Sequence, residues 1–167
     1  MIRQLWQFVF FQIQWWCCLL STVSPHYHDL FLLALVLAVY DACRHFKIPT
    51  RWLLFLLIAS LGLINDTLLM HVNILYFFDD SLLIIPPWLL VLWLCFGGWF
   101  LKADWINNNY FLMALLGALG GPLSYFAGFK LGAISFPQPL LLTMIILSVD
   151  WLLLALTLTT LNGLCRK

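Results

Sequence analysis

Residues 117–133, GALGGPLSYFAGFKLGA, combine paired glycines, a proline and a lysine in a stretch that otherwise has the character of one membrane-spanning helix. Gly117 and Gly121 have the GxxxG spacing, and Gly128 and Gly132 repeat it. Small residues at this spacing let a second backbone approach closely. We therefore expect a closely packed helix in this part of the chain.

Pro122 follows the pair Gly120 and Gly121 in the middle of this segment. Proline lacks a backbone N–H and clashes with the preceding turn, so we expect the helix to kink or break there. In a bilayer, protein or a wet cavity must then satisfy the freed carbonyl group. Ser124 and Tyr125 come directly after the proline and are candidates for that role.

The composition excludes a soluble globular domain. Hydrophobic residues make up 64% of the chain and charged residues 9%, with a mean hydropathy of +1.00. Soluble domains are roughly 45–50% apolar and about 25% charged. The net charge of +1 gives no basic footprint for nucleic acid. The partner that the composition predicts is the lipid bilayer.

Six segments are apolar enough to be membrane-spanning helices, each of which needs about 20 mostly apolar residues. They lie at about residues 5–23, 28–43, 52–70, 87–104, 110–129 and 139–161. The second and fourth are short and need flanking residues. The loops between the segments are too short for a separate domain. We therefore predict an all-α, polytopic integral membrane protein with a single helical-bundle domain over residues 1–167.

The basic residues predict the orientation of this bundle, because positively charged loops remain cytoplasmic. If the N-terminus is cytoplasmic, seven basic residues share its side and Lys130 alone lies outside. The seven are Arg3, Arg44, Lys47, Arg51, Lys102, Arg166 and Lys167. We expect a multi-pass protein of the bacterial cytoplasmic (inner) membrane with both termini in the cytoplasm.

Two features of the outer side remain open at this level. The loop at about 71–86 is unusually apolar around Asp79 and Asp80, and it either lies on the membrane surface or dips into it. His26, His28 and Asp29 resemble part of a metal site, but nothing fixes a third ligand. The five cysteines form no CxxC pair. We expect no metal and no cofactor.

Two carboxylates fall inside predicted spans, Asp66 and Asp150. A charge in hydrocarbon costs at least about 2.5–3.5 kcal/mol, so each is a functional candidate by default. The alternative is that each carboxylate bonds to a neighbouring helix and fixes the packing. The candidate polar site consists of Asn65, Asp66, His71, Ser124, Tyr125, Lys130 and Asp150. Lys130 either snorkels at the outer interface or pairs with Asp66.

The segments FVFFQIQWWCCLL (8–20), GLINDTLLMHVNILYF (62–77), PPWLLVLWLCF (86–96) and above all 117–133 resemble a bacterial family of inner-membrane proteins known only as a domain of unknown function. The resemblance covers nearly the whole chain. It implies a multi-helix inner-membrane protein with no established activity, loosely associated with bacterial genes for fatty-acid modification under photo-oxidative stress. The family pattern has a small residue, usually Gly, at a tight turn where this chain has Asn73.

Three hypotheses follow, of which we favour the first. It is an accessory or scaffold component in envelope lipid metabolism, working with another inner-membrane protein. The second is a small proton- or solute-coupled carrier or channel with its site at the broken fifth helix, which would need a homodimer. The third is an intramembrane lipid-modifying enzyme using Asp66, His71 and Lys130. The chain lacks GxSxG, HExxH and a phosphate-binding glycine loop, which weighs against an enzyme.

Overall fold

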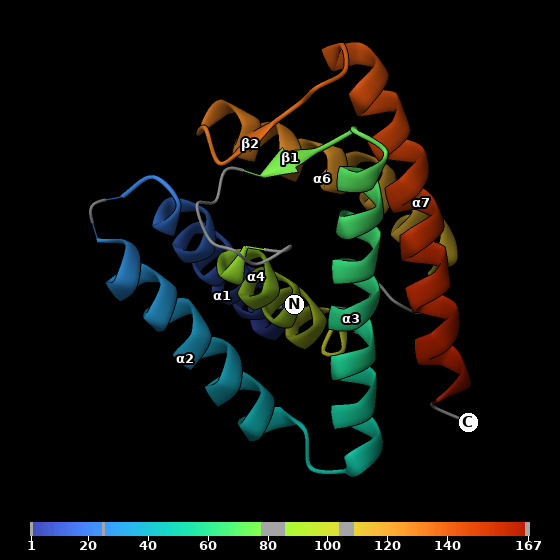
Figure 1. Cartoon of the computed structure of the whole chain (residues 1–167). Coiled ribbons are helices and arrows are strands. Elements are labelled where there is room, and N and C mark those ends of the chain that lie inside the picture. Colours follow the sequence, from blue (N-terminus) through green and yellow to red (C-terminus); the bar gives the residue numbers. More distant parts are fainter. Residues whose placement is uncertain (1, 25, 78–85, 104–108, 166–167) are drawn as a thin grey trace. The chain divides into compact units, whose positions relative to one another are not determined.

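The computed structural model of the chain describes residues 2–24, 26–77, 86–103 and 109–165 (Figure 1). These ranges contain six α-helices, which confirms the all-α class and the positions of the six predicted segments to within a few residues. The helices are α1 (Ile2–Ser21), α2 (Tyr27–His45), α3 (Pro49–His71), α4 (Pro87–Phe100), α6 (Tyr110–Lys130) and α7 (Leu140–Leu164).

The helices begin where the sequence offers suitable first residues. Pro87 is the first residue of α4, a position where the missing N–H of proline costs nothing. The side chain of Asn109 caps α6 by accepting a hydrogen bond of 3.0 Å from the backbone N–H of Leu112. These local signals explain why helix starts could be predicted closely.

The sequence predicts a kink or a break at Pro122; the break is wrong, and the kink stays a prediction. Helix α6 runs without interruption from Tyr110 to Lys130, with Pro122 buried inside it. The hydroxyl of Ser124 donates to the carbonyl of Gly121 at 2.7 Å. Proline is tolerated in an apolar helix when neighbouring groups hold the helix together, and here α6 packs along α7.

A two-stranded antiparallel ribbon was not predicted. Strand β1 (Tyr76–Phe77) pairs with β2 (Ile134–Ser135), with Tyr76 opposite Ser135. Each strand follows a helix end that turns through a left-handed residue, Asn73 with φ 57° and Gly132 with φ 78°. Asn and Gly are the residues that adopt this conformation most readily, so the turn at position 73 forms although Gly is absent. Gly132 therefore ends a helix and lies outside the packed segment.

The chain forms two compact units. The first comprises Met1–Thr67 and Asp79–Ala103, and the second comprises Leu68–Phe78 and Asp104–Lys167. In the first unit α1, α2 and α4 pack against one another. Their contact includes the small buried side chains Cys17, Cys18, Ala34, Ala38 and Cys95. Small residues bring the three helices close, which positions the polar groups at the helix ends.

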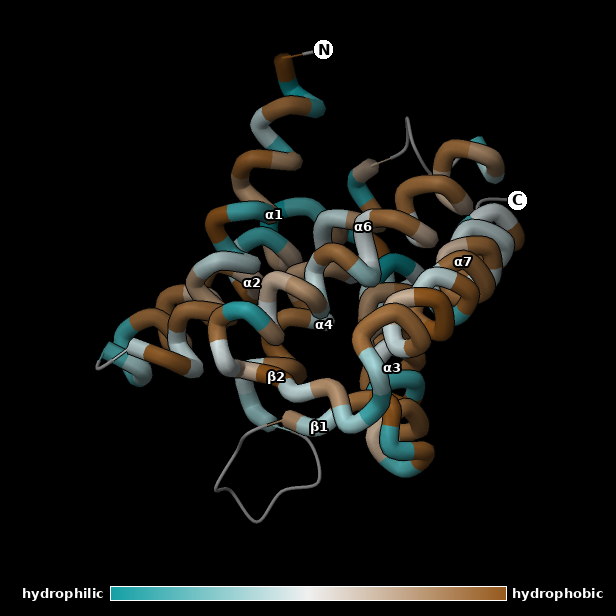
Figure 2. The backbone as a smooth tube through the Cα atoms, turned by 90° about the horizontal axis from the view of Figure 1, so that it is seen from above, coloured by the Kyte–Doolittle hydropathy of each residue, from teal (hydrophilic) through white to brown (hydrophobic). Residues whose placement is uncertain are grey.

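Three of the described helices are long and apolar enough to cross a membrane: α3, α6 and α7. Helix α4 is apolar but has only 14 residues. In Figure 2 the tube of α7 is brown along most of its length, and its exposed side chains include Leu141, Val149 and Leu153. Exposed leucine and valine on this scale would be unfavourable in water and are typical of a surface that faces lipid.

Helices α6 and α7 make the close contact of the second unit. A Cβ atom added to Gly117 would lie 2.6 Å from the Cβ of Ala155 and 2.7 Å from the backbone oxygen of Trp151. A Cβ atom added to Gly121 would overlap the indole ring of Trp151. At Gly120, by contrast, a Cβ atom would have nothing within 4 Å. The face of α6 that carries Gly117 and Gly121 is therefore in tight contact with α7, whereas Gly120 is not.

We predict that Gly117→Ala destabilises the protein by about 1–3 kcal/mol, because backbone atoms of α7 cannot move aside for the methyl group. The matched control, Gly120→Ala, adds the same methyl group to an open position and is expected to leave stability unchanged or slightly higher. SDS titration of the purified protein in mild detergent, followed by circular dichroism, compares the two. Equal stability of the two variants would contradict the close contact.

Candidate functional site

Asp66 lies in the first unit, on α3, and is fully buried. The indole Nε1 of Trp93 on α4 donates a hydrogen bond of 2.7 Å to its Oδ2 atom. Trp93 is itself 1% exposed. A hydrogen bond to an ionised or polar acceptor in such surroundings is strong because no water competes for it. The carboxyl group therefore joins α3 to α4.

Gly62 makes room for this bond. It precedes Asp66 by one helical turn, and a Cβ atom at Gly62 would overlap the indole ring of Trp93. The ring therefore lies directly against the backbone of α3, with its N–H directed at Asp66. Asn65 and His71 lie on the same helix, Asn65 half-buried and His71 exposed at the helix end.

The remaining members of the predicted polar site, like His71, belong to the second unit. Tyr125 is buried, with its ring centroid 6.2 Å from that of Trp151 on α7. Asp150 is half-buried on α7. Exposed Lys130 ends α6, with Nζ 5.3 Å from the ring centroid of Phe126 and 5.9 Å from that of Phe129. Its ammonium group thus rests over two aromatic faces, a favourable cation–π arrangement. The pairing of Lys130 with Asp66 stays a prediction.

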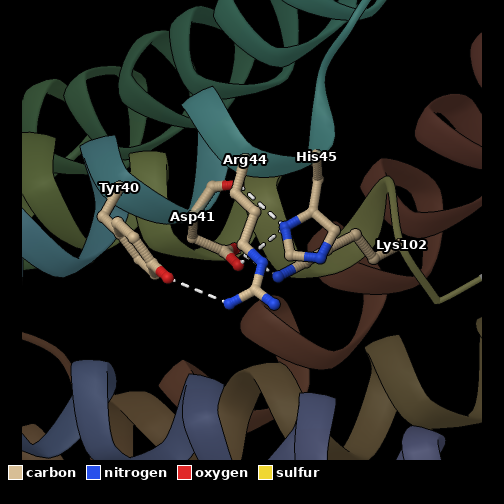
Figure 3. Close-up of polar contacts among 5 residues, drawn as sticks. All are labelled: Tyr40, Asp41, Arg44, His45 and Lys102. Carbon is tan, nitrogen blue, oxygen red and sulfur yellow. Dashed lines mark hydrogen bonds and ion pairs between the residues drawn. The ribbon is translucent and has the colours of Figure 1, made fainter.

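A second polar cluster, which sequence reasoning missed, lies in the first unit (Figure 3). Asp41 is in the last two turns of α2, and Lys102 comes two residues after the end of α4. The ammonium group of Lys102 donates to Oδ2 of Asp41 and forms an ion pair with it. The two side chains are 8% and 9% exposed. Burial of an ion pair is tolerated only when both partners are present, so this contact links α2 to the end of α4.

His45 completes the cluster. Its Nδ1 atom lies 2.9 Å from the backbone oxygen of Asp41 and 3.2 Å from Oδ1 of the same residue. Both oxygens are acceptors, so Nδ1 is the ring nitrogen that carries a hydrogen. Asp41 thereby fixes the imidazole ring, and the side chain of His45 remains 34% exposed. The Nε2 atom is the part of the ring that is left for other partners.

Further basic groups surround this cluster. The guanidinium of Arg44 donates to the hydroxyl of Tyr40 at 2.9 Å (Figure 3). Arg51 donates to the backbone oxygen of Leu101 at 3.3 Å. The arrangement therefore offers positive charge and an oriented imidazole around one neutralised carboxylate. Such a set can bind an anion.

A sequence signal for Asp41 existed. Ala34, Ala38, Asp41 and Ala42 are the buried residues of α2, and they follow a helical spacing of three and four. A carboxylate on that small-residue face, inside a predicted span, is a candidate by the same rule that singled out Asp66. Its partner could not be found in this way, because Lys102 is 61 residues away in sequence.

His26 and Asp29, members of the weak metal motif in the sequence, form a loose contact. Nδ1 of His26 lies 3.7 Å from Oδ2 of Asp29, and both side chains are largely exposed. Within the described ranges, no group of three or more His, Cys, Asp or Glu side chains is placed to hold a metal ion. Asp79, Asp80 and most of the apolar loop around them lie outside the described residues.

We predict that Lys102→Met destabilises the protein by about 3–5 kcal/mol, because the Asp41 carboxylate would remain buried without a counter-ion. The double variant Asp41→Asn/Lys102→Met removes both charges and should recover much of that loss. Arg44→Gln, which removes an exposed charge, serves as the control and should cost less than about 1 kcal/mol. SDS titration measures all three, and a double variant that is no more stable than Lys102→Met would contradict the ion pair.

No curated protein and no solved structure matches this chain. A family model does match, over residues 4–157, a range that includes Asp41, Lys102, Asp66 and Trp93. The description of that family is "Protein of unknown function (DUF2878)". Since the match covers nearly all of the sequence, the chain belongs to this family of proteins of unknown function.

Proposed function

We propose that the protein is a multi-pass protein of the bacterial inner membrane that serves as an accessory or scaffold component in envelope lipid metabolism. Three helices with the length and hydropathy of spans support the membrane location. Helices α1 and α2, with 20 and 19 residues, would each reach about 28–30 Å, close to the thickness of the hydrocarbon core. The setting in lipid metabolism comes from the family resemblance.

The distribution of basic residues supports six spans with both termini in the cytoplasm. In this topology the turn between α2 and α3 and the residues after α4 share the cytoplasmic side. The ion pair of Asp41 with Lys102 is consistent with that arrangement, because its two residues come from segments assigned to the same side. Lys130, at the end of α6, would be the single basic residue outside.

The burial of Asp66 is the observation that carries the scaffold role. A carboxylate that moves protons or acts on a lipid must reach its substrate, whereas Asp66 is fully buried and bonded to Trp93. The carrier alternative depended on a broken fifth helix, and α6 is continuous. In this scaffold role the protein acts through the surfaces that contact lipid and a second protein. Intramembrane polar groups would serve mainly to hold the helices.

We predict that Asp66→Asn retains the function, because the amide oxygen of Asn can accept the same hydrogen bond from Trp93. Native mass spectrometry of the protein released gently from its own membrane is the test. Wild type and Asp66→Asn are expected to retain the same partner protein, with no small ligand that depends on Asp66. Asp150→Asn is the matched control in the second unit. A defined lipid or solute that disappears only in Asp66→Asn would overturn the scaffold role.

The topology can be tested with the natural cysteines. Cys43 and Cys165 are exposed, whereas Cys17, Cys18 and Cys95 are buried. We expect a membrane-impermeant maleimide to leave Cys165 unlabelled in intact spheroplasts and to label it after permeabilisation. The variant His28→Cys puts a thiol in the first turn of α2, at its expected outer end, and should be labelled without permeabilisation. Labelling of Cys165 in intact spheroplasts would contradict the cytoplasmic C-terminus.

A further inference from the structure

The connection between α2 and α3, which we call the basic turn, is defined by residues 44–51. It contains Arg44, His45, Lys47 and Arg51 within eight positions. Arg44, His45 and Lys47 are exposed, and Arg51 is half-buried. The whole turn belongs to the first unit. Its charged groups are therefore gathered on one short segment that joins two expected spans.

The basic turn has an excess of positive charge. The nearby carboxylate of Asp41 is already paired with Lys102, and no ion pair in the described part of the chain involves Arg44, Lys47 or Arg51. The first turn of α3 contains no acidic residue, and its helix N-terminus adds a positive partial charge. Like charges so close together repel one another, and a bound anion would relieve that repulsion.

Hydrogen bonds hold the basic turn in place. The backbone N–H of Phe46 donates to the oxygen of Ala42 at 2.9 Å, and the indole Nε1 of Trp52 donates to the oxygen of Phe46 at 3.1 Å. The rings of Phe46, Trp52 and Phe55 also pack on one another, with centroids 5.4–5.9 Å apart. A site whose backbone is fixed before binding loses less entropy when the ligand arrives.

Exposed apolar side chains lie on both helices that the basic turn joins. Exposed Val36 and Val39 lie on α2, and exposed Leu53 and Leu56 lie on α3. Tyr40 and Trp52, one on each helix, are aromatic residues of the kind found at headgroup depth. Positive charge beside exposed apolar side chains can bind both parts of a ligand that has an anionic head and an apolar body. A free anion would use only the charges.

We propose that the basic turn binds the phosphate group of an anionic phospholipid, with the acyl chains against the exposed apolar residues of α2 and α3. The proposal rests on the membrane location given under the proposed function. Arg44 and Arg51 provide guanidinium groups, which match phosphate oxygens in pairs, and Lys47 adds a third positive charge. Polybasic segments beside spans attract anionic lipids in this way.

The test is a titration of the purified full-length protein in neutral detergent with short-chain phosphatidylglycerol, read by native mass spectrometry. Phosphatidylcholine of the same chain length and inorganic phosphate are titrated in parallel. We expect phosphatidylglycerol to bind in preference to both. Each basic residue near an anionic lipid contributes about fivefold in affinity, so Arg44→Gln/Lys47→Gln/Arg51→Gln should weaken binding on the order of 100-fold.

The matched control is Arg3→Gln/Arg166→Gln/Lys167→Gln, which removes the same formal charge from residues assigned to the same side. Its affinity should stay within about twofold of wild type. Arg51 also bonds to Leu101, so Arg44→Gln/Lys47→Gln is a second variant that spares this contact and should lose about 25-fold.

Three outcomes would overturn the proposal: equal binding of phosphatidylcholine, equal binding of inorganic phosphate, or equal loss in the control. Each can occur while Cys165 labelling still supports the topology, in which case only the headgroup site fails. Conversely, selective binding of phosphatidylglycerol by a chain of reversed topology would leave this site intact and overturn the proposed orientation.

Discussion

Burial of the Asp41 carboxylate depends on the ammonium group of Lys102, which reaches it from beyond the end of α4. A charged group removed from water without a counter-ion costs several kcal/mol, more than a small apolar contact returns. The ends of α2 and α4 are therefore held together at this point. Asp41 also fixes the ring of His45, and the basic turn begins beside it. The ion pair therefore helps to position both the imidazole of His45 and the start of the basic turn.

Asp66 is a second buried carboxyl group, and its hydrogen-bond donor, the indole of Trp93, is neutral. The indole N–H of Trp93 donates to the carboxyl oxygen of Asp66 between α3 and α4. The missing side chain of Gly62 lets the large ring come close enough to do so. Both contacts follow from one constraint: a polar group in an apolar helix must be satisfied by another part of the protein.

This constraint bears on function. A buried carboxylate that bonds to a neighbouring helix stabilises the bundle, and its burial keeps it away from lipid-soluble substrates. Groups that remain accessible are then the better guide to what the protein meets. In the first unit these are the exposed cations of the basic turn and the apolar side chains beside it. Their combination is typical of a surface at the boundary between hydrocarbon and headgroups.

The sequence by itself determined the all-α class, the position of the six helices and the close contact at Gly117 and Gly121. Each of these depends on local hydropathy, on spacing along a helix or on capping residues, which can be read within one segment. Asp66 was also found in this way, because a carboxylate in an apolar run is visible without a structure.

Only the tertiary structure decided which groups meet. Asp41 and Lys102 are 61 residues apart, and Asp66 and Trp93 are 27 apart, so neither pair has a signature in sequence. The same holds for the β1–β2 ribbon, whose strands have two residues each, too few for a pattern. The continuous course of α6 through Pro122 depends on a neighbouring helix that local preference does not include. Hydropathy predicts which residues are buried. The packing of neighbouring helices decides which hydrogen-bond or ion-pair partner each buried polar group has.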